Sequence, residues 1–567
     1  MQKKWVFKDL PQDPEINALS TALNIDRNLA AILIQRGIDD FQKAKDFFRP
    51  SLQQLHDPFL MKDMEEAVTC VQEAMAQNHK ILVYGDYDVD GTTAVALVYS
   101  FLRSQHQQVD FYVPDRYTEG YGLSAKALDW AVEHEYKLII TLDCGIKAVD
   151  LVAQGVAQGL NFIICDHHLP GPQLPAAKAI LDPKREDCAY PFNDLSGCGV
   201  GFKLVQALCH KLNIPIEVTY DYLDLVAVSI AADLVPILGE NRIMAYYGLR
   251  ILNKKPRPGL GALIEVSGLK GKVGITEIVF GIAPRINAAG RIEHANSAVR
   301  LLLAQKRKEA EPWAHKVNER NSTRKTVDTN ITREAIQMIE QAEDTTDSKS
   351  TVLYKEDWHK GVIGIVASRC IEKYYRPTII LTESQDKATG SARSVEGFDI
   401  YEAIAACSDL LDAYGGHKYA AGLTMPLEKI PQFQRRFEEV VSATITEEML
   451  TPVLEIDRCL EVDDIDRKFY NVLRQLAPFG PGNRTPVLVS KNLTAHSEAR
   501  VLKEEHLKFR IKSPKGRYFE GVAFGLARYA DRINAGTPFD LAYTLEVNEY
   551  RGAKSLQMMV KDIKLKQ

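Results

Sequence analysis

The chain has 567 residues, too many for a single hydrophobic core, and its length predicts roughly three or four domains. Its 46% apolar and 26% charged residues are typical of a globular protein. No apolar run is long enough to predict a membrane span, and the first residues do not resemble a signal peptide. Nine cysteines without Cys-x-x-Cys spacing favour free thiols in a reducing cytoplasm and argue against structural zinc.

Charge is distributed unevenly along the chain. The net charge is −5, which by itself does not indicate a nucleic-acid partner. Residues 471–567, however, carry 17 Lys and Arg against 9 Asp and Glu, a balance of +8 that leaves −13 for the rest. A basic end on an acidic body indicates a polyanionic partner at that end. A solvated basic face would explain the same numbers.

The first half of the chain begins with a short helical lead-in, residues 1–50, in which 28–48 has helical periodicity. An amphipathic helix over 62–77 then leads into a strand that starts at Ile81. Apolar strands and helices alternate from there: strands over 109–114, 137–142, 162–165 and 177–181, and helices over 94–102, 124–133 and 222–232. This alternation predicts a mainly parallel sheet covered on both faces.

In the second half, glycine, lysine and proline interrupt the pattern over 253–274, and a helix is strongest over 298–343. A polar linker over 343–348 precedes a second α/β unit. The end of the chain shows five short alternating strands, over 486–489, 506–512, 517–524, 540–548 and 556–563, which indicate a small β-barrel. The predicted domains are a helical segment 1–50, a catalytic domain 51–245, a connecting helical segment 246–350, a second α/β lobe 351–445 and a barrel 446–567.

Three aspartates at alternate positions, Asp86, Asp88 and Asp90, follow the strand that starts at Ile81. On an extended chain this spacing sends all three side chains to one side. Carboxylates that close cannot all ionise without a cation, and oxygen ligands suit Mg²⁺ or Mn²⁺. The alternative is a turn rich in Asp and Gly.

Three more sites of this kind follow apolar segments: Asp143, the triplet Asp166-His167-His168, and Asp233. Alone, each Asp could cap a helix and each His could be an ordinary imidazole. Parallel strands that all end in acids would bring them to one edge of the sheet. Carboxylates with a neutral imidazole predict a two-metal site for attack on phosphorus.

The ordered set Asp88-x-Asp90-Gly91, Asp143, Asp166-His167-His168 and Asp233 resembles the four motifs of the DHH phosphoesterase superfamily. Further segments make the chain similar, over essentially its whole length, to the RecJ family of single-strand-specific DNA exonucleases. They are 85–91 (GDYDVDG), 284–291 (PRINAAGR), 390–394 (GSARS) and 415–417 (GGH).

The resemblance implies an α/β enzyme of two lobes, the DHH core and a DHHA1 lobe. A long helix would connect the lobes, an OB-like β-barrel would follow, and the active site would lie in the cleft between the lobes. One or two Mn²⁺ or Mg²⁺ ions would be bound by Asp86, Asp88, Asp90, Asp143, His167 and Asp233. Asp143 would bridge the ions, Asp166 would orient His167, and His168 would face the scissile phosphate. The catalytic residues would thus be Asp143, Asp166 and His168.

For the nucleic acid, the resemblance places Arg116 on a terminal 5′-phosphate and Tyr121 on a base. Along the connecting segment, Arg285, Asn287, Arg291, Asn321 and Arg324 would follow the strand's backbone, with a solvent-facing helix charge as the alternative for Arg324. In the second lobe, Ser391, Arg393 and Ser394 offer donors to phosphate oxygens, and His417 adds another. Gly415 and Gly416 let backbone amides approach an anion, or form a tight turn.

In the barrel, lysines and arginines are interleaved with aromatic residues, which fits single-strand binding by charge and stacking. They are Lys508, Arg510, Lys512, Lys515 and Arg517, with Phe509, Tyr518 and Phe519. About half of the aromatic side chains would instead fill the barrel core.

By resemblance, then, the expected function is a metal-dependent 5′-to-3′ exonuclease acting on single-stranded DNA in repair and recombination. The expected partner is a single strand with a free 5′ end, and a single-strand binding protein and a helicase are family expectations for a monomeric enzyme. One alternative is a DHH-type phosphodiesterase for short oligonucleotides or cyclic dinucleotides, although such enzymes usually lack the barrel and the long helix. Another is a non-catalytic single-strand binding protein, against which the intact metal residues argue.

Overall fold

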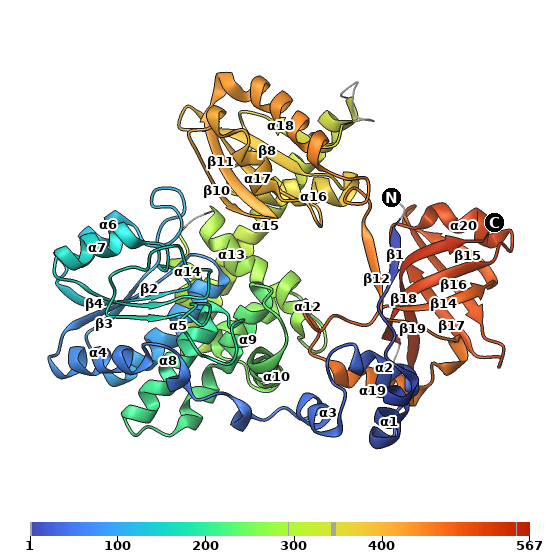
Figure 1. Cartoon of the computed structure of the whole chain (residues 1–567), viewed down its shortest axis with the longest axis horizontal. Helices are drawn as coiled ribbons and strands as arrows, with labels where there is room; N and C mark the ends of the chain where they lie inside the picture. Colours follow the sequence, from blue (N-terminus) through green and yellow to red (C-terminus); the bar gives the residue numbers. More distant parts are fainter. Residues whose placement is uncertain (1–2, 293, 342–347, 551–552, 567) are drawn as a thin grey trace.

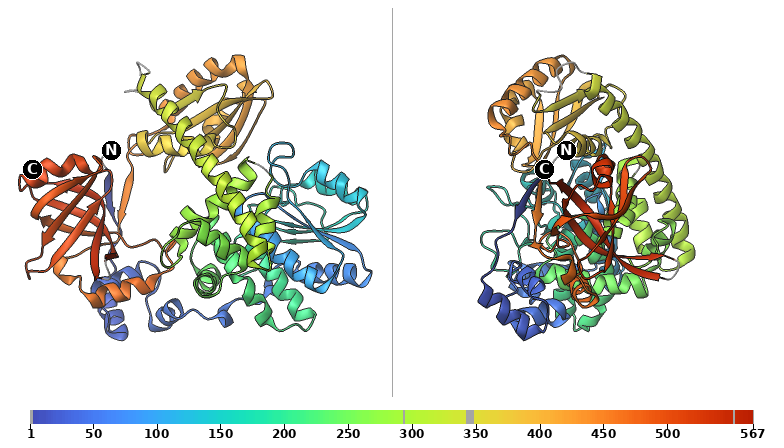
Figure 2. Two further views of the ribbon diagram at one scale, coloured as in Figure 1. Left: turned by 180° about the vertical axis from the view of Figure 1, so that it is seen from behind. Right: turned by 90° about the vertical axis from the view of Figure 1, so that its right-hand side faces the viewer.

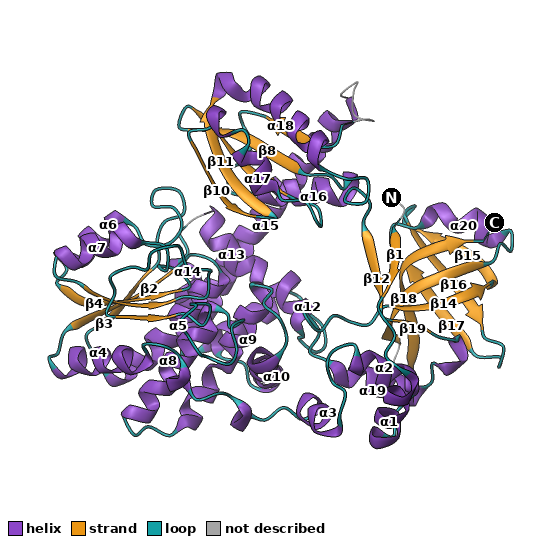
Figure 3. Cartoon of the chain, in the orientation of Figure 1, coloured by secondary structure: helices purple, strands orange, loops and turns teal. Residues whose placement is uncertain are grey.

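The computed structural model describes residues 3–292, 294–341, 348–550 and 553–566. Figure 1 shows three bodies: a first lobe, a second lobe and a C-terminal domain that packs with the N-terminus. Figure 3 shows that the first two combine helices with a sheet, whereas the C-terminal domain is mostly strands. The predicted fold class is confirmed. Within the described residues, no helix is both long enough and apolar enough to cross a bilayer.

The first lobe is built on a five-stranded, wholly parallel sheet with the strand order β3-β2-β4-β5-β6. The strands are β2 (Lys80–Gly85), β3 (Val109–Tyr112), β4 (Tyr136–Leu142), β5 (Asn161–Cys165) and β6 (Ala179–Leu181). One face packs on α4 (Met64–Ala76), α5 (Val89–Gln105) and α8 (Gly197–Lys211), and the other on α6 (Ala125–Glu133) and α7 (Val149–Ala157). Because both faces are covered, the strands are apolar almost throughout, as the sequence predicts.

Helix α5 begins five residues earlier than the sequence predicts. Asp88 is its N-cap, with a carboxylate oxygen that accepts a hydrogen bond from the Gly91 amide at 3.1 Å, so Asp90 lies in the first helical turn. The expectation that Asp86, Asp88 and Asp90 extend from one strand is therefore wrong. The cause is local: aspartate is a preferred N-cap, and Gly91 has no side chain to collide with the backbone of Asp86.

Helices complete the first lobe and lead out of it. They are η3 (Ile216–Tyr222), α9 (Leu223–Ala232), α10 (Gly239–Lys254), α11 (Pro258–Val266), α12 (Ile275–Glu277), the π-helix η4 (Ile278–Ile282), α13 (Ala283–Ile292), α14 (Asn296–Leu303) and α15 (Arg307–Gln341). The predicted boundary at 245 falls inside α10, and the predicted helix over 298–343 is two helices, α14 and α15. From behind, Figure 2 shows α15 running from the first lobe to the second. Most of the predicted linker 343–348 lies outside the described residues.

The second lobe has a five-stranded sheet in the order β10-β11-β9-β8-β7, in which only β7 and β8 are parallel. Its strands are β7 (Thr351–Tyr354), β8 (Thr378–Ser384), β9 (Lys387–Arg393), β10 (Ala413–His417) and β11 (Ala420–Pro426). Its helices are α16 (Ile363–Tyr374), α17 (Ile400–Ala405) and α18 (Ile430–Thr444). Helix α16 shares a small core with α15, which attaches the lobe to the connecting helix.

The C-terminal domain is a mainly antiparallel sheet in the order β13-β14-β18-β19-β17-β16-β15. Its strands are β13 (Arg458–Cys459), β14 (Leu488–Leu493), β15 (Ala495–Leu502), β16 (His506–Lys512), β17 (Tyr518–Ala523), β18 (Phe539–Tyr550) and β19 (Ala553–Leu565), and its helices are α19 (Arg467–Leu473) and α20 (Ala530–Asn534). The five predicted strands are present. Strands β13 and β15 and both helices were not predicted.

The N-terminal segment belongs to the C-terminal domain in space. Helices α1 (Asp13–Leu23), α2 (Arg27–Ile34) and α3 (Phe41–Phe48) contribute apolar side chains to the core of that domain. In addition, β1 (Lys4–Phe7) pairs in parallel with β12 (Val453–Ile456), the strand that enters the domain. The sequence predicts helices here but not β1, because its partner lies about 450 residues away.

Candidate active site

Acidic residues follow three adjacent strands of the first lobe. Asp86 follows β2, Asp143 follows β4 and Asp166 follows β5, and these strands are neighbours in the sheet. The carboxyl ends of parallel strands meet at one edge, so the predicted convergence is present. Asp143 itself has φ of +60°, which is uncommon for a residue other than glycine and turns the chain sharply after the strand.

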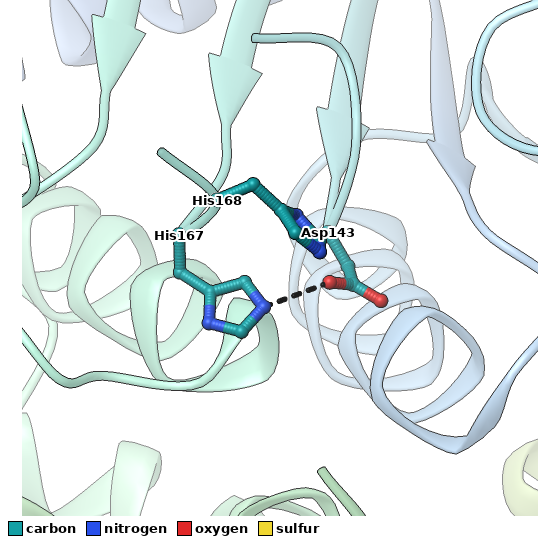
Figure 4. Close-up of side chains that lie close together, drawn as sticks. All are labelled: Asp143, His167 and His168. Atoms are coloured by element: carbon teal, nitrogen blue, oxygen red, sulfur yellow. Dashed lines mark ion pairs between the residues drawn. The ribbon is translucent and has the colours of Figure 1, made fainter. Parts of the chain in front are cut away.

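The imidazole of His167 lies at the centre of the cluster. Its Nε2 atom is 3.2 Å from Asp143 Oδ1, 3.6 Å from Asp233 Oδ2 and 3.7 Å from Asp90 Oδ2. Figure 4 shows His167 pointing toward Asp143, with His168 beside them. Three separate segments therefore bring carboxylates to one nitrogen, and groups of these atoms are close enough to share a metal ion.

Two buried atoms of the cluster match a metal site. The Nδ1 atom of His167 lies 3.0 Å from the carbonyl oxygen of Leu195, which can only accept, so Nδ1 carries the proton and Nε2 the lone pair. His167 Nε2 and Asp86 Oδ2 are both buried without a hydrogen-bond partner among the described residues. Buried polar atoms are almost always paired, and a divalent cation is a partner for both of these acceptors.

The raised pKa values of the carboxylates also indicate a cation site. Burial and the neighbouring carboxylates raise the pKa of Asp143 and of Asp86 well above the usual range. Burial, with the charges of Asp90 and Asp88, raises the pKa of Asp233 to about 8. Asp90 is fixed by hydrogen bonds from the Gly197 and Cys198 amides and from the Ser229 hydroxyl, each 2.7 Å long. Such a crowded set of acids is stable when a cation compensates its charge.

Asp166 differs from its predicted role. Its carboxylate pairs with Nδ1 of His168 at 2.7 Å, and it accepts bonds from the amides of Ile146, His167 and His168. It therefore orients His168, whereas the Leu195 carbonyl orients His167. Burial lowers the pKa of His168, but the bond and charge of Asp166 outweigh burial and raise it. The shift therefore favours the protonated form more than in a free imidazole, and the side chain of His168 remains 35% exposed.

Tyr121 and Arg116 lie beside this centre. The Tyr121 hydroxyl donates to the Asp143 carbonyl at 3.0 Å, while the residue is 55% exposed, so its ring is accessible to a base. The guanidinium of Arg116 lies over the ring of Tyr87, 5.0 Å from its centroid. Tyr87 lies between Asp86 and Asp88 in the sequence, which places Arg116 next to the acidic cluster.

A cleft of about 550 Å³ separates the two lobes. Of the predicted residues it is lined by Arg116, Arg291, Ser391, Arg393, Gly415 and Gly416. Tyr117, Lys360, Gly361 and Gly364 also line it and were not predicted. The spacing Gly361-x-x-Gly364 at the start of α16 is a signal that could have identified them, because glycines at a helix N-terminus often face an anion.

Positive charge is concentrated in this cleft. Burial, with the charges of Arg116, Arg324 and Arg393, lowers the pKa of Arg291 to about 10. Burial, with the charge of Arg116, lowers the pKa of Arg393. The guanidinium groups therefore repel one another, and an anion between them would remove that repulsion. Such a cleft suits a phosphate group.

Several residues predicted to bind the strand instead make hydrogen bonds inside the protein. Arg285, Asn321 and Arg324 are buried: Arg285 donates to Asn318 and the Gly281 carbonyl, and Arg324 donates to Asn321 and Asp328. In this structure they cannot follow a strand's backbone, and the solvent-facing alternative for Arg324 is also wrong. The bond from Arg285 to Asn318 joins α13 to α15, whereas the bonds of Arg324 stay within α15.

Three further predicted residues have local contacts. Asn287 accepts a hydrogen bond from the Val89 amide at 3.1 Å and so supports the start of α5. The Ser394 hydroxyl donates to the Phe398 carbonyl at 2.8 Å and does not line the cleft. His417 ends β10, and burial, with the charges of Lys147 and His168, lowers its pKa, which places it opposite the first lobe.

In the C-terminal domain, Phe509 and Phe519 are buried in the core and Tyr518 is 56% exposed. The expectation that about half of these aromatic residues fill the core therefore agrees with the structure. Arg510, Lys512 and Lys515 are exposed, and Lys508 is half-buried and pairs with Glu520. Arg517 is instead held by the carbonyl oxygen of Ile465.

Comparisons with known proteins agree with this architecture. Residues 80–230 match the DHH family, N-terminal domain, residues 347–443 the DHHA1 domain and residues 456–562 the RecJ OB domain. The chain is 38% identical to the single-stranded-DNA-specific exonuclease RecJ of Bacillus subtilis (strain 168), over 99% of this chain and 70% of that protein. It is 34% identical to RecJ of Escherichia coli (strain K12), over 89% of this chain and 90% of that protein.

Solved structures show the same likeness. RecJ from Thermus thermophilus in complex with Mn²⁺ superposes with a TM-score of 0.85 at 29% identity, covering all of this chain and 80% of that one. The same protein in complex with Mg²⁺ gives a TM-score of 0.80 at 28% identity, covering all of this chain and 79% of that one. With the full-length relatives and the three domain matches, these likenesses show that the chain belongs to the RecJ family.

Proposed function

We propose that this chain is a metal-dependent exonuclease that hydrolyses single-stranded DNA, and that it begins at a 5′ end. The observation that carries the proposal is the position of Arg116. Its side chain lines the basic cleft between the lobes. It also lies over the ring of Tyr87, which stands between Asp86 and Asp88 in the sequence. A terminal phosphate in the cleft would therefore bring the first phosphodiester bond to the metal centre.

The residues at the centre suit one or two Mn²⁺ or Mg²⁺ ions. Asp86, Asp88, Asp90, Asp143, His167 and Asp233 would hold the ions. Bound there, such ions lower the pKa of a water molecule and compensate charge on the leaving oxygen.

The protein's own groups would do the remaining work. His168, held by Asp166, would donate a hydrogen bond to the scissile phosphate, and its raised pKa favours the protonated form. Tyr121 would stack on a base without regard to its identity. Arg116, Arg393, Ser391 and the Gly415-Gly416 backbone would bind the terminal phosphate. Arg291 would contribute its charge, while His417 would act from the rim of the cleft.

The alternatives are less well supported. A phosphodiesterase for dinucleotides would have no use for the basic C-terminal domain, which matches the RecJ OB domain. A non-catalytic binding protein would not need buried acceptors arranged around His167. Action in DNA repair and recombination, a cytoplasmic location, a monomeric state, and partnership with a single-strand binding protein or a helicase remain predictions from the sequence.

We also propose a division of labour among the parts. The first lobe carries the metals, the second lobe binds the terminal phosphate, and the C-terminal domain holds the strand at a distance from both. The connecting helix α15 is tied to α13 by the bond from Arg285 to Asn318 and to α16 of the second lobe by the pair of Asp328 with Arg369 at 2.8 Å. The N-terminal segment, by its packing, is part of the C-terminal unit.

Single strands labelled at either end test this function. With Mn²⁺, a 5′-labelled strand should lose its label at once as a mononucleotide, whereas a 3′-labelled strand should shorten step by step. EDTA should abolish both reactions. Loss of the 3′ label first would contradict the proposed polarity. Cleavage of dinucleotides alone would favour the phosphodiesterase, and binding without cleavage would favour the binding protein.

A further inference from the structure

We propose that Asn241 and Arg242, consecutive residues at the start of α10, are positioning residues for the metal centre. Asn241 would hold together the two loops that carry or orient metal ligands, and Arg242 would tie them to the segment that enters the C-terminal domain. The inference rests on the proposed function, because it takes the cluster around His167 as the metal site.

Asn241 connects the two loops directly. It is fully buried, and its Nδ2 atom donates to the carbonyl oxygens of Asp194 at 2.5 Å and Pro236 at 3.0 Å. Both neighbours are acceptors, so the orientation of the amide is fixed by its surroundings. One side-chain amide thus sets the spacing between the two loops.

Each loop acts on a metal ligand. The residue after Asp194 is Leu195, whose carbonyl accepts the hydrogen bond that orients His167. Pro236 lies three residues after Asp233. Between them, Leu234 has φ of +58°. A leucine in this left-handed conformation is strained and persists only where the surroundings hold it. A contact with Pro236 supplies part of that restraint, so loss of Asn241 would release both His167 and Asp233.

Arg242 faces the opposite way and binds main-chain oxygens of two distant segments. Its guanidinium donates to the carbonyls of Phe47, Leu476, Ala477 and Pro478, and lies 3.6 Å from the ring centroid of Phe47. It is 4% exposed, and burial, together with the nearby charge of Arg36, lowers its pKa to about 9. A planar fork with five donors can hold several carbonyls at once, which a lysine ammonium cannot.

The segment that Arg242 holds also contacts the loop after Asp233. The Ile237 amide donates to the Pro481 carbonyl at 2.7 Å. A Cβ atom on Gly480 would lie 2.5 Å from Ile237 Cγ1, so the two chains are in contact without room for a side chain. Gly480 and Asn483 exchange backbone hydrogen bonds at 3.0 Å. The side-chain amide of Asn483 donates to the Leu476 and Pro478 carbonyls at 2.8 Å. Residues 476–483 therefore form a stiff turn that packs against the loop after Asp233.

It follows that the C-terminal unit contributes to metal affinity and not only to strand binding. Replacing a group that is hydrogen-bonded directly to a metal ligand typically changes metal affinity or activity about 10- to 100-fold. Asn241 and Arg242 act one step further out, through the backbone of the loops, so we expect effects at the low end of that range. A residue that served only general stability would lower the melting temperature and leave metal affinity in the folded protein unchanged.

The experiment measures Mn²⁺ binding to the full chain by calorimetry, without DNA. We expect Asn241→Asp, which keeps the shape but replaces the donor nitrogen, and Arg242→Lys, which keeps the charge, each to bind Mn²⁺ about 10-fold more weakly. Arg250→Lys is the matched control, because Arg250 is an exposed arginine on the same helix. Raising the Mn²⁺ concentration should restore kcat in the two variants.

Gly480→Ala approaches the same loop from the C-terminal side and should also weaken Mn²⁺ binding, so the test survives if one α10 variant does not fold. If the unaltered protein does not bind Mn²⁺, the proposed function fails. If it does, and the folded variants bind Mn²⁺ as tightly as the Arg250→Lys control, the positioning role is refuted.

Discussion

The substitution Gly364→Ala tests the phosphate-binding role of the cleft with a single methyl group. A Cβ atom at this position would lie 2.7 Å from Arg393 Nη2 and 2.8 Å from Ser391 Oγ, so both side chains would have to move. Gly364 lies in α16, where alanine is favoured over glycine by up to about 1 kcal/mol. The fold should therefore tolerate the change, whereas the geometry of the cleft should not.

The expected size of the effect follows from the hydrogen bond that Arg393 would no longer make to the phosphate. A hydrogen bond to a charged group contributes about 1.5–3 kcal/mol, which corresponds to about 10- to 150-fold in kcat/KM. Within the protein, Nη1 of Arg393 donates to Ser391 and to the Ala392 carbonyl, which leaves Nη2 to face a ligand. The decrease should appear with a 5′-phosphorylated strand and be small with a 5′-hydroxyl strand.

The assay compares the two substrates, each labelled at the 3′ end, at saturating Mn²⁺. The preference for the phosphorylated strand should fall in Gly364→Ala and in Arg393→Lys, and it should persist in Glu372→Gln, an exposed position two turns further along the same helix. If the preference is unchanged in both cleft variants, the cleft does not bind the terminal phosphate, and the assignment of Arg393 is wrong.

Three further predictions concern the metal centre and the C-terminal domain. Asp143→Ala should abolish cleavage and leave strand binding largely intact, and turnover above a few per cent of the unaltered protein would remove Asp143 from the metal site. Mn²⁺ affinity should fall as pH decreases through about 8, because the raised pKa of Asp233 lets protons compete for the carboxylate below that value; equal affinities on the two sides of that pH by calorimetry would contradict this. Replacing the exposed Arg510 and Lys512 by Gln should lower the slope of log affinity against log salt by about 0.7 for each phosphate that is no longer neutralised, and an unchanged slope would exclude this face from strand binding.

The sequence predicts the convergence of these acidic residues well because the signal is local. Apolar runs that end in Asp86, Asp143 and Asp166 require only that parallel strands share an edge. Asp90 is harder to place, because whether the chain continues as strand or starts a helix after Asp88 depends on capping and on the packing of Gly91 against Asp86. The partner of Asp166 is not predictable, since either neighbouring histidine satisfies the same spacing and the choice depends on rotamers.

Burial of charged residues is the main source of error. Arg285 and Arg324 are of a residue type expected on a strand-binding surface. Each, however, donates hydrogen bonds to oxygen atoms inside the helical bundle. A charge pattern alone cannot distinguish an internal hydrogen-bond network from an external one. A chain that ends before Thr451 would not test whether the barrel binds the strand. Such a truncation would also remove most of the core on which the N-terminal helices pack.

The pairing of the two ends has a consequence for how the protein is made. The Trp5 indole donates to Asp562 at 2.8 Å, and Ile16, Leu19 and Leu29 are buried against side chains of residues from Leu460 onward. At about 5–20 residues per second, synthesis leaves these early apolar residues without their partners for roughly half a minute to a minute and a half. During that interval the ribosome-bound chain presents an unfinished hydrophobic surface at its start, so chaperone capture would be expected there.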